Sequence, residues 1–298
     1  MNSIQTFGYS ERGMVNALCY EMRHSPDGLR LVQEFLGLIT FPFSQPNFAE
    51  VQGATFIIEQ SFSDFGDLDL LILLDGPVEQ AVLVEAKVKT AQTNEWSIAA
   101  QWAAFCDLPQ AVAKTSNLFM QLYRKMRLVH AIRSSETSLE PNGRAPKSSL
   151  GQNAVVKTAA DRLRDYCGNT WFVSLIPGPK ADTQEYFARE LVKPIPDLPH
   201  WDHRRLGFLN WGELEKHCQE RPRDWPTMLE NFAYNQGQIY GATIPSIPQR
   251  PPPPGSLVTW NDGTTKQAVA IKNRGQRNTR IVLENGSTVK VPNDQLHG

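Results

Sequence analysis

The sequence is poor in cysteine. Its four cysteines, Cys19, Cys106, Cys167 and Cys218, are widely spaced, and no C-x-x-C pair occurs among them. Zinc sites and disulfide frameworks use paired or closely spaced cysteines, so this spacing argues against both kinds of site. It predicts buried thiols in a reducing compartment.

Net charge and long apolar runs are also missing. The chain has 30 Lys and Arg against 31 Asp and Glu, a formal net charge of −1, so no bulk field favours nucleic acid. Any phosphate-binding surface must then come from local clustering. No apolar run approaches the roughly 20 residues needed to cross a bilayer, and the first residues lack a basic segment followed by an apolar one. We therefore expect a cytoplasmic protein with no membrane partner.

Two apolar runs of strand length, residues 67–74 and 81–87, flank the turn sequence Asp75-Gly76-Pro77. This pattern predicts a β-hairpin. If the hairpin is centred near Pro77, residues whose numbers sum to about 154 face each other. Asp69 then lies opposite Glu85, and Asp67 lies opposite Lys87. All four charged groups would project from one face at one end of the hairpin.

Such charges are costly on a buried strand unless they are paired or bound to metal. Two carboxylates can hold Mg²⁺, which prefers oxygen ligands, and Lys87 could orient or help deprotonate a water beside the ion. The arrangement predicts metal-assisted attack on a phosphodiester. The alternative is a solvated hairpin end with an ordinary surface ion pair. Strands that are apolar on both faces, as central strands are, argue against that alternative.

At these residues the sequence resembles the PD-(D/E)XK nuclease superfamily. Asp69 takes the place of the motif's aspartate, and Glu85-Ala86-Lys87 reads as its E-x-K, although Leu68 replaces the leading residue of the usual Pro-Asp pair. The resemblance implies that Asp69 and Glu85 bind Mg²⁺, with Mn²⁺ as a possible substitute, and that Lys87 is the catalytic lysine. It also implies a restriction-endonuclease-like α/β fold, a mixed β-sheet flanked by helices, over about residues 10–235.

Two further residues enter through the same resemblance. Glu11, near the start of the first predicted helix, matches a glutamate that serves the family as a further metal ligand. Gln101, followed by Trp102, resembles a glutamine that contacts the lysine or the scissile phosphate. Each also has an ordinary explanation, because the helix dipole favours a carboxylate in a first turn and glutamine is common on helix surfaces.

Apolar spacing predicts the other elements of the chain. Residues 134–152 are polar and read as a flexible loop or insertion. The expected helices cover residues 10–22, 28–38, 95–105, 117–133 and 154–166, and the expected strands cover 55–60, 170–177 and 204–211. The last strand runs into a further expected helix at residues 212–214. Ser10 is the expected N-cap of the first helix.

The helix expected over residues 117–133 is rich in bases. Arg124, Lys125 and Arg127 are expected on faces away from its apolar positions. There they could hold a phosphate backbone beside the cleft. The alternative is a solvated helix face without a partner.

The C-terminal part divides at a proline-rich stretch. We expect a nuclease-like domain over residues 1–240, and a polyproline linker over 241–255 that is a stiff spacer or a ligand for a proline-reading domain. Residues 256–298 alternate strands with hairpin turns and resemble a small all-β SH3-like barrel of the Tudor or KOW kind. The module is locally basic, with Lys272, Arg274 and Arg277, so nucleic acid or a protein peptide is its expected partner.

Three functions remain open. The first is a Mg²⁺-dependent nuclease, a DNA endonuclease of bacterial or phage defence or of DNA processing by family analogy, for which a homodimer would allow both strands to be cut. The second is a non-catalytic nuclease-like binding protein, favoured by the neutral charge. The third is a nucleotidyltransferase that uses Asp67 and Asp69. It needs a Gly-Ser helical turn upstream, which residues 61–66 lack, and it leaves Lys87 without a role.

Overall fold

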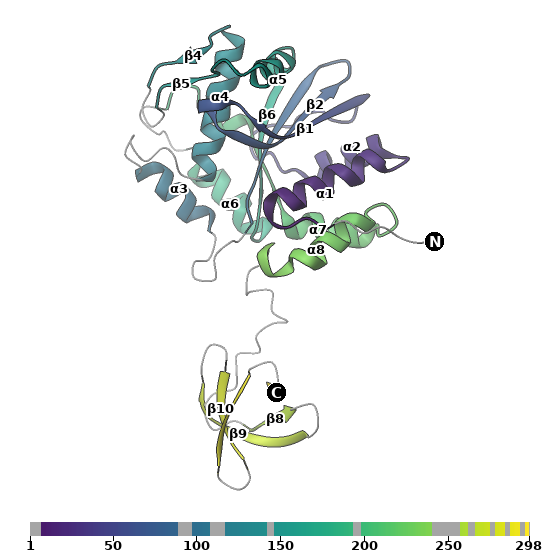
Figure 1. The fold of residues 1–298 in the computed structure, drawn as a ribbon, viewed down its shortest axis with the longest axis vertical. Coiled ribbons are helices and arrows are strands. Elements are labelled where there is room, and N and C mark those ends of the chain that lie inside the picture. The colour runs from purple at the N-terminus through teal and green to yellow at the C-terminus, as the bar shows by residue number, and fades with distance from the viewer. Residues whose placement is uncertain are drawn as a thin grey trace. The chain divides into compact units, whose positions relative to one another are not determined.

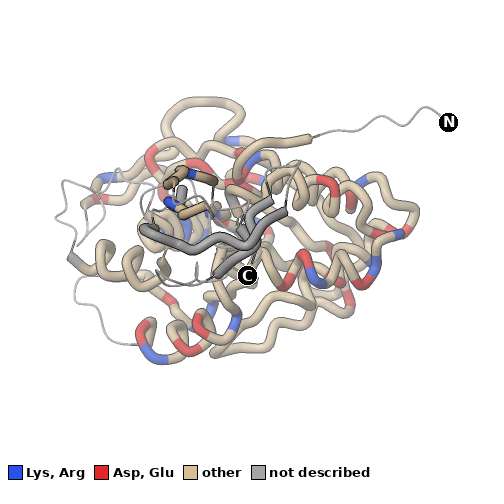
Figure 2. The backbone as a smooth tube through the Cα atoms, turned by 90° about the horizontal axis from the view of Figure 1, so that it is seen from below, with Lys and Arg blue, Asp and Glu red and all other residues tan. Residues whose placement is uncertain are grey.

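The computed structural model describes residues 7–88, 97–107, 117–141, 146–192, 198–239, 257–261, 266–274, 278–283, 287–292 and 296–297. Within the full chain there are two compact units, Met1–Gly241 and Ala242–Gly298. In the described part, no helix combines the length and the apolar character that a bilayer crossing requires. Basic and acidic residues are interspersed along the described backbone (Figure 2).

The first unit is organised on a five-stranded mixed sheet with the strand order β1-β2-β3-β6-β7 (Figure 1). Neighbours are antiparallel from β1 to β3 and parallel from β3 to β7. The central strand β3 is therefore antiparallel to one neighbour and parallel to the other. The strands are β1 (Gly53–Ser61), β2 (Asp67–Asp75), β3 (Gln80–Ala86), β6 (Thr170–Ile176) and β7 (Leu206–Asn210).

Helices cover both faces of this sheet (Figure 1), as the sequence predicts. Side chains alternate along each strand, so Leu70 and Ile72 of β2 pack in one core while Leu71 and Leu73 pack in the other. The first core includes α1 (Ser10–His24), α2 (Gly28–Leu38), α7 (Trp211–Glu220) and α8 (Pro226–Ile239). The second includes α3 (Ile98–Asp107), α4 (Leu118–Arg133), α5 (Ala154–Arg164) and α6 (Lys180–Glu190).

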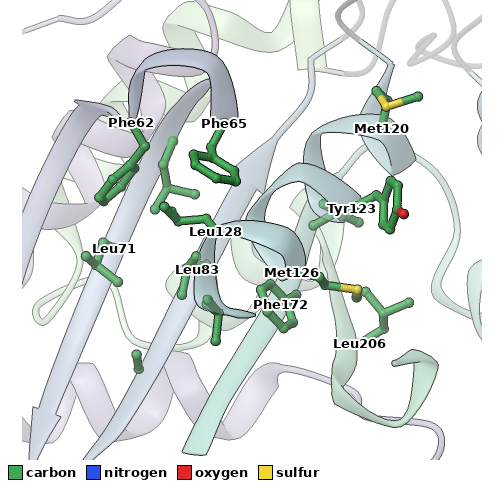
Figure 3. Close-up of a cluster of buried hydrophobic side chains, with 14 of the residues drawn as sticks. Phe62, Phe65, Leu71, Leu83, Met120, Tyr123, Met126, Leu128, Phe172 and Leu206 are labelled. Carbon is green, nitrogen blue, oxygen red and sulfur yellow. The ribbon is translucent and has the colours of Figure 1, made fainter. Parts of the chain in front are cut away.

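Helix α4 lies against the sheet on the second face. Figure 3 shows Met120, Tyr123, Met126 and Leu128 of this helix beside the sheet residues Leu71, Leu83 and Phe172. Fully burying one such side chain contributes about 1.5–3 kcal/mol. Most residues of α4 are buried by this packing, including the charged residues Lys125 and Arg127.

Helix α8 holds the start of α1 in place. The N–H of Gly8 donates to Oδ1 of Asn231 (2.9 Å), and Nδ2 of Asn235 donates to the Gly8 carbonyl (2.8 Å). Both asparagines are buried. We call this set of contacts the α8 latch. It fixes the first turn of α1, which carries Glu11.

Most predicted elements are present, with local differences. Asn117 caps α4 by accepting from the N–H of Met120, and the second predicted helix matches α2. Ser10 is not the N-cap of α1. It is the first helical residue, and its N–H donates to Oδ1 of Asn235 at 3.3 Å. The acceptor therefore comes from α8, which is far away in the sequence. Helices α6 and α8 had no counterpart in the sequence analysis.

Short elements complete the first unit. Two-residue strands β4 (Ser138–Leu139) and β5 (Ser148–Ser149) pair within the expected loop, and the single-turn helices are η1 (Ser63–Phe65), η3 (Cys167–Asn169) and η4 (His203–Arg205). None of the four cysteines forms a disulfide. Three are buried and Cys106 is half-buried.

The second unit contains an antiparallel sheet with the order β11-β10-β9-β8-β12. Its strands are β8 (Leu257–Asn261), β9 (Lys266–Arg274), β10 (Asn278–Val282), β11 (Thr288–Pro292) and β12 (Leu296–His297). Lys272 and Arg274 belong to β9, and Arg277 lies outside the described residues. Nucleic-acid binding by these three residues, and the proline linker, stay predictions.

Candidate active site

The β2–β3 hairpin brings Asp69 to the end of the strand that carries Glu85. Paired residues follow the predicted register, as in Leu71 opposite Leu83. Just beyond the last pair, Oδ2 of Asp69 accepts a hydrogen bond of 2.7 Å from the N–H of Ala86. Asp69 also contributes to raising the Glu85 pKa, so the two predicted metal ligands are electrostatic neighbours.

Glu85 is completely buried on β3. Burial raises its pKa to about 7, Lys125 opposes this rise, and Asp69 adds to it. Among the described residues, neither carboxylate oxygen of Glu85 has a hydrogen-bond donor. The nearest cation is the ammonium group of Lys125, whose Nζ lies 3.5 Å from Oε1. A buried carboxylate with unused oxygens is costly unless a cation or a proton neutralises it.

Two lysines accompany the two carboxylates. Lys87 is buried, and its Nζ donates to the Ala86 carbonyl at 2.9 Å. Its charge lowers the Glu85 pKa. Lys125 reaches the same place from α4 and donates to the Phe65 carbonyl at 3.0 Å. Burial lowers the Lys125 pKa, and Glu85 opposes that shift. The site therefore places two acids beside two bases, with Asp69 half-buried and Glu85, Lys87 and Lys125 buried.

The backbone of Lys87 is held on both sides. Its N–H donates to the Leu175 carbonyl of β6 (2.8 Å), and its carbonyl accepts from the indole N–H of Trp211 (2.8 Å). Trp211 is fully buried at the junction of β7 and α7. The end of β3 is thus fixed by residues far along the chain.

Glu11 reaches this strand end from α1. Its Oε1 accepts a hydrogen bond of 3.2 Å from the N–H of Val88. However, in the described ranges no three His, Cys, Asp or Glu side chains converge closely enough to hold a metal ion. Glu11 is therefore near the site, and its role as a third ligand beside Asp69 and Glu85 stays a prediction.

Asp67 lies outside the cluster, which corrects the expectation that it faces Lys87. It pairs with Ser61 of β1 at the first position of β2, and its side chain is exposed. Asp67 and Lys87 are both described, and they make no ion pair with each other. The antiparallel ladder of β2 and β3 ends before this position because β3 stops at Ala86.

Gln101 joins two helices on the second face of the sheet. Its Oε1 accepts from the N–H of Leu118 (3.0 Å), and its carbonyl accepts from Nδ2 of Asn117 (2.6 Å). These bonds satisfy the start of α4. No hydrogen bond joins Gln101 and Lys87, both of which are described, so contact with the lysine stays a prediction.

The expectation of a displayed basic surface on α4 is wrong for two of its three residues. Lys125 is fully buried and Arg127 is 1% exposed. The Arg127 guanidinium donates to the Glu140 carbonyl (2.8 Å) and Ser148 Oγ (3.1 Å), so it fastens the segment around β4 and β5. Arg124 is partly exposed. Helix α4 packs on several sides, so Lys125 and Arg127 make internal contacts and do not face solvent.

Two polar groups near Glu85 were missed by the sequence analysis. The sequence pattern of α4 predicts Lys125 on the surface, and no local signal marks Ser174 as a site residue. Ser174 pairs with Glu85 across β3 and β6, and its buried Oγ has no partner among the described residues. The Ser174 hydroxyl and the Glu85 carboxylate, which is ion-paired with Lys125 through Oε1, are oxygen groups of the kind that a hard cation or a water contacts. Asp69 and Glu85 have the oxygen donors that Mg²⁺ prefers, and the Lys125 ammonium, 3.5 Å from Glu85 Oε1, already neutralises part of their charge. Metal binding by this pair stays a prediction.

Comparison of the chain with protein-family models, curated proteins and solved structures found no match.

Proposed function

We propose that this protein is a Mg²⁺-dependent nuclease that hydrolyses phosphodiester bonds, with DNA as its substrate. One observation carries the proposal. The register of the hairpin brings the Asp69 carboxylate onto the backbone of the Glu85-Ala86-Lys87 segment, with Glu85 buried beside it. This is the neighbourhood that the resemblance to the PD-(D/E)XK superfamily implies.

Asp69 and Glu85 would hold the metal ion, and Glu11 would approach from the start of α1. When bound, Mg²⁺ supplies Lewis-acid stabilisation of the phosphoryl oxygens and lowers the pKa of a coordinated water. Burial raises the Glu85 pKa to about 7, and a divalent cation bound beside it would favour the charged carboxylate instead.

The protein's own groups would position the reactants. The Lys87 ammonium would hold the attacking water in line with phosphorus. The water oxygen would form the new P–O bond as its proton passes to solvent. The bond to the leaving sugar oxygen would break, and that oxygen would take up a proton from solvent. Lys87 suits positioning because its backbone is fixed by Leu175 and Trp211.

A second candidate is a non-catalytic, nuclease-like binding protein. The observation that favours it is Lys125, whose buried ammonium lies 3.5 Å from Glu85 and neutralises the carboxylate without metal. In that case the Glu85–Lys125 pair replaces the ion, and the scaffold presents a surface to a partner. The formal net charge of −1 is compatible with a protein partner.

We further propose that residues 256–298 form an SH3-like barrel that binds nucleic acid or a peptide. The antiparallel order of β8–β12 supports this assignment. The nuclease proposal includes a cytoplasmic location. It also includes a homodimer, because one site per chain cuts one strand per event.

The test is cleavage of supercoiled plasmid, single-stranded DNA and RNA in Mg²⁺, Mn²⁺ or EDTA. We expect metal-dependent nicking by the wild type, with loss of about 10²-fold or more in Glu85→Gln, which removes a charge used in the transition state. Asp69→Asn should behave alike. Asp67→Asn is the matched control, since Asp67 lies two residues away on the same strand and is exposed.

The outcomes separate the functions. Retained activity in Asp67→Asn supports the nuclease and counts against a nucleotidyltransferase that uses Asp67. No cleavage by folded wild type of any substrate in either metal contradicts the nuclease proposal. Binding of DNA or protein in that case supports the scaffold.

A further inference from the structure

A polar cavity lies beside the C-terminal half of α4. It has a volume of about 260 Å³ and lies between the C-terminal half of α4, the start of β6 and residues 200–205. Basic groups dominate its wall: His130, Arg133, His200, Arg204 and Arg205, against the single acid Asp202. Neither the hairpin motif nor the nuclease proposal uses any of these residues.

Two histidines are stacked in this wall. The imidazole rings of His130 and His200 have centroids 3.7 Å apart and planes inclined by 19°. His200 also has a φ of 71°, in the left-handed region that is unfavourable for most residues other than glycine. Strained backbone of this kind persists only where its surroundings hold it, and it concentrates at functional positions. The stacked pair forms one part of the cavity wall.

The charge in the cavity is largely uncompensated. Burial lowers the His200 pKa, His130 and Arg127 lower it further, and Glu136 alone opposes them. Asp202 is already engaged by Arg204 at 2.9 Å and by Arg205 at 3.6 Å.

One cation in particular remains available. Within the described ranges, Arg133 forms no ion pair, and its side chain is exposed. An anion entering the cavity therefore meets at least one guanidinium that has no competing carboxylate.

We propose that this cavity binds a phosphomonoester. Guanidinium groups match the oxygens of phosphate geometrically, and several cationic or protonatable groups suit a dianion better than the singly charged phosphodiester. The volume admits one small ligand. A free nucleotide and the phosphorylated end of a nucleic acid strand share this chemistry.

The site does not depend on the nuclease proposal. Thr170, which lines the cavity, pairs with Ala81, whereas Ser174 pairs with Glu85. Four residues of parallel strand separate the two positions, about 13 Å at the usual rise. Phosphomonoester binding can therefore be measured without metal and without cleavage.

The test uses the full chain without divalent metal. Calorimetry with inorganic phosphate, adenosine 5′-monophosphate, a 5′-phosphorylated oligonucleotide and its 5′-hydroxyl counterpart should show binding of the two phosphomonoesters and of inorganic phosphate, which shares their dianionic group. Histidine NMR signals should shift for His130 and His200. Arg133→Gln should weaken binding about tenfold, by loss of a charge-assisted contact. His200→Asn should do the same, because asparagine tolerates the left-handed backbone.

Arg189→Gln is the control, because Arg189 is exposed on α6 and pairs with Glu185. It should bind like the wild type. Tighter binding of the nucleotide identifies a small ligand, and tighter binding of the 5′-phosphorylated strand identifies a strand end. The proposal is overturned if no phosphomonoester binds at millimolar concentration. Equal binding of the 5′-hydroxyl strand, or unchanged binding in Arg133→Gln, also overturns it.

Discussion

The buried pair of Glu85 and Lys125 predicts a stability that depends on pH in a defined direction. Burial raises the Glu85 pKa from 4.5 to about 7, which corresponds to about 3 kcal/mol between its protonated and charged forms. Because the folded pKa lies above the unfolded one, this group's contribution is most favourable below pH 4.5. It declines as the pH rises to about 7 and is level above that.

Lys125→Met removes the largest influence that keeps the Glu85 pKa from rising further. The Glu85 pKa then moves above 7, and stability continues to fall beyond neutral pH. At pH 8, breaking a buried ion pair should cost about 3–5 kcal/mol. At pH 5.5 Glu85 is protonated in both proteins. The substitution should then cost about 1 kcal/mol, from the lost hydrogen bond to the Phe65 carbonyl.

Urea unfolding followed by near-UV circular dichroism at pH 5.5, 7 and 8 measures the difference. The double variant Glu85→Gln/Lys125→Met is the control, because it has no ionisable group at either position and should lose the site's pH dependence. Equal destabilisation of Lys125→Met at pH 5.5 and pH 8 would refute the reasoning. It would mean that Lys125 stabilises by packing alone.

Other contacts give simpler expectations. The Tyr166 hydroxyl donates to Asp75 (2.6 Å), which raises the tyrosine pKa to about 12. Its stabilisation is thus present below pH 10 and is lost as the pH rises through 12. Tyr166→Phe should cost about 0.5–1 kcal/mol in urea unfolding at pH 8, and an unchanged midpoint would contradict this. A Cβ on Gly207 would lie 2.6 Å from the Phe41 ring, so Gly207→Ala should destabilise by about 1–3 kcal/mol. Gly37→Ala, with open space in α2, should stabilise by about 0.5–1 kcal/mol in thermal unfolding; the same direction of change in both glycine variants would contradict the packing argument.

The hairpin and its register could be predicted because their signals are local. A Gly-Pro turn between two apolar runs sets which residues face each other, and the observed pairs of β2 and β3 agree. Strands β6 and β7 could also be predicted, because each is a local run of mostly apolar residues. Helix α6 buries only Thr183 and Phe187, so its apolar periodicity is too weak to detect.

The partners of the site residues could not be predicted in the same way. Lys125 lies 40 positions from Glu85, and nothing in the local pattern of α4 distinguishes it from a solvated base. A lysine is normally expected in water, and only the packing of α4 on the sheet makes it an internal counter-ion. Gln101 likewise finds Leu118 through tertiary structure.

The α8 latch has a consequence for the growing chain during translation. Glu11 is among the first residues made, yet the contacts that fix its helix come from Asn231 and Asn235. The Lys87 carbonyl likewise waits for Trp211. A nascent chain that has emerged only through β3 therefore carries the acidic motif without its supports. The cluster reaches its final geometry only after α8 has left the ribosome, so an incomplete chain has no preorganised site.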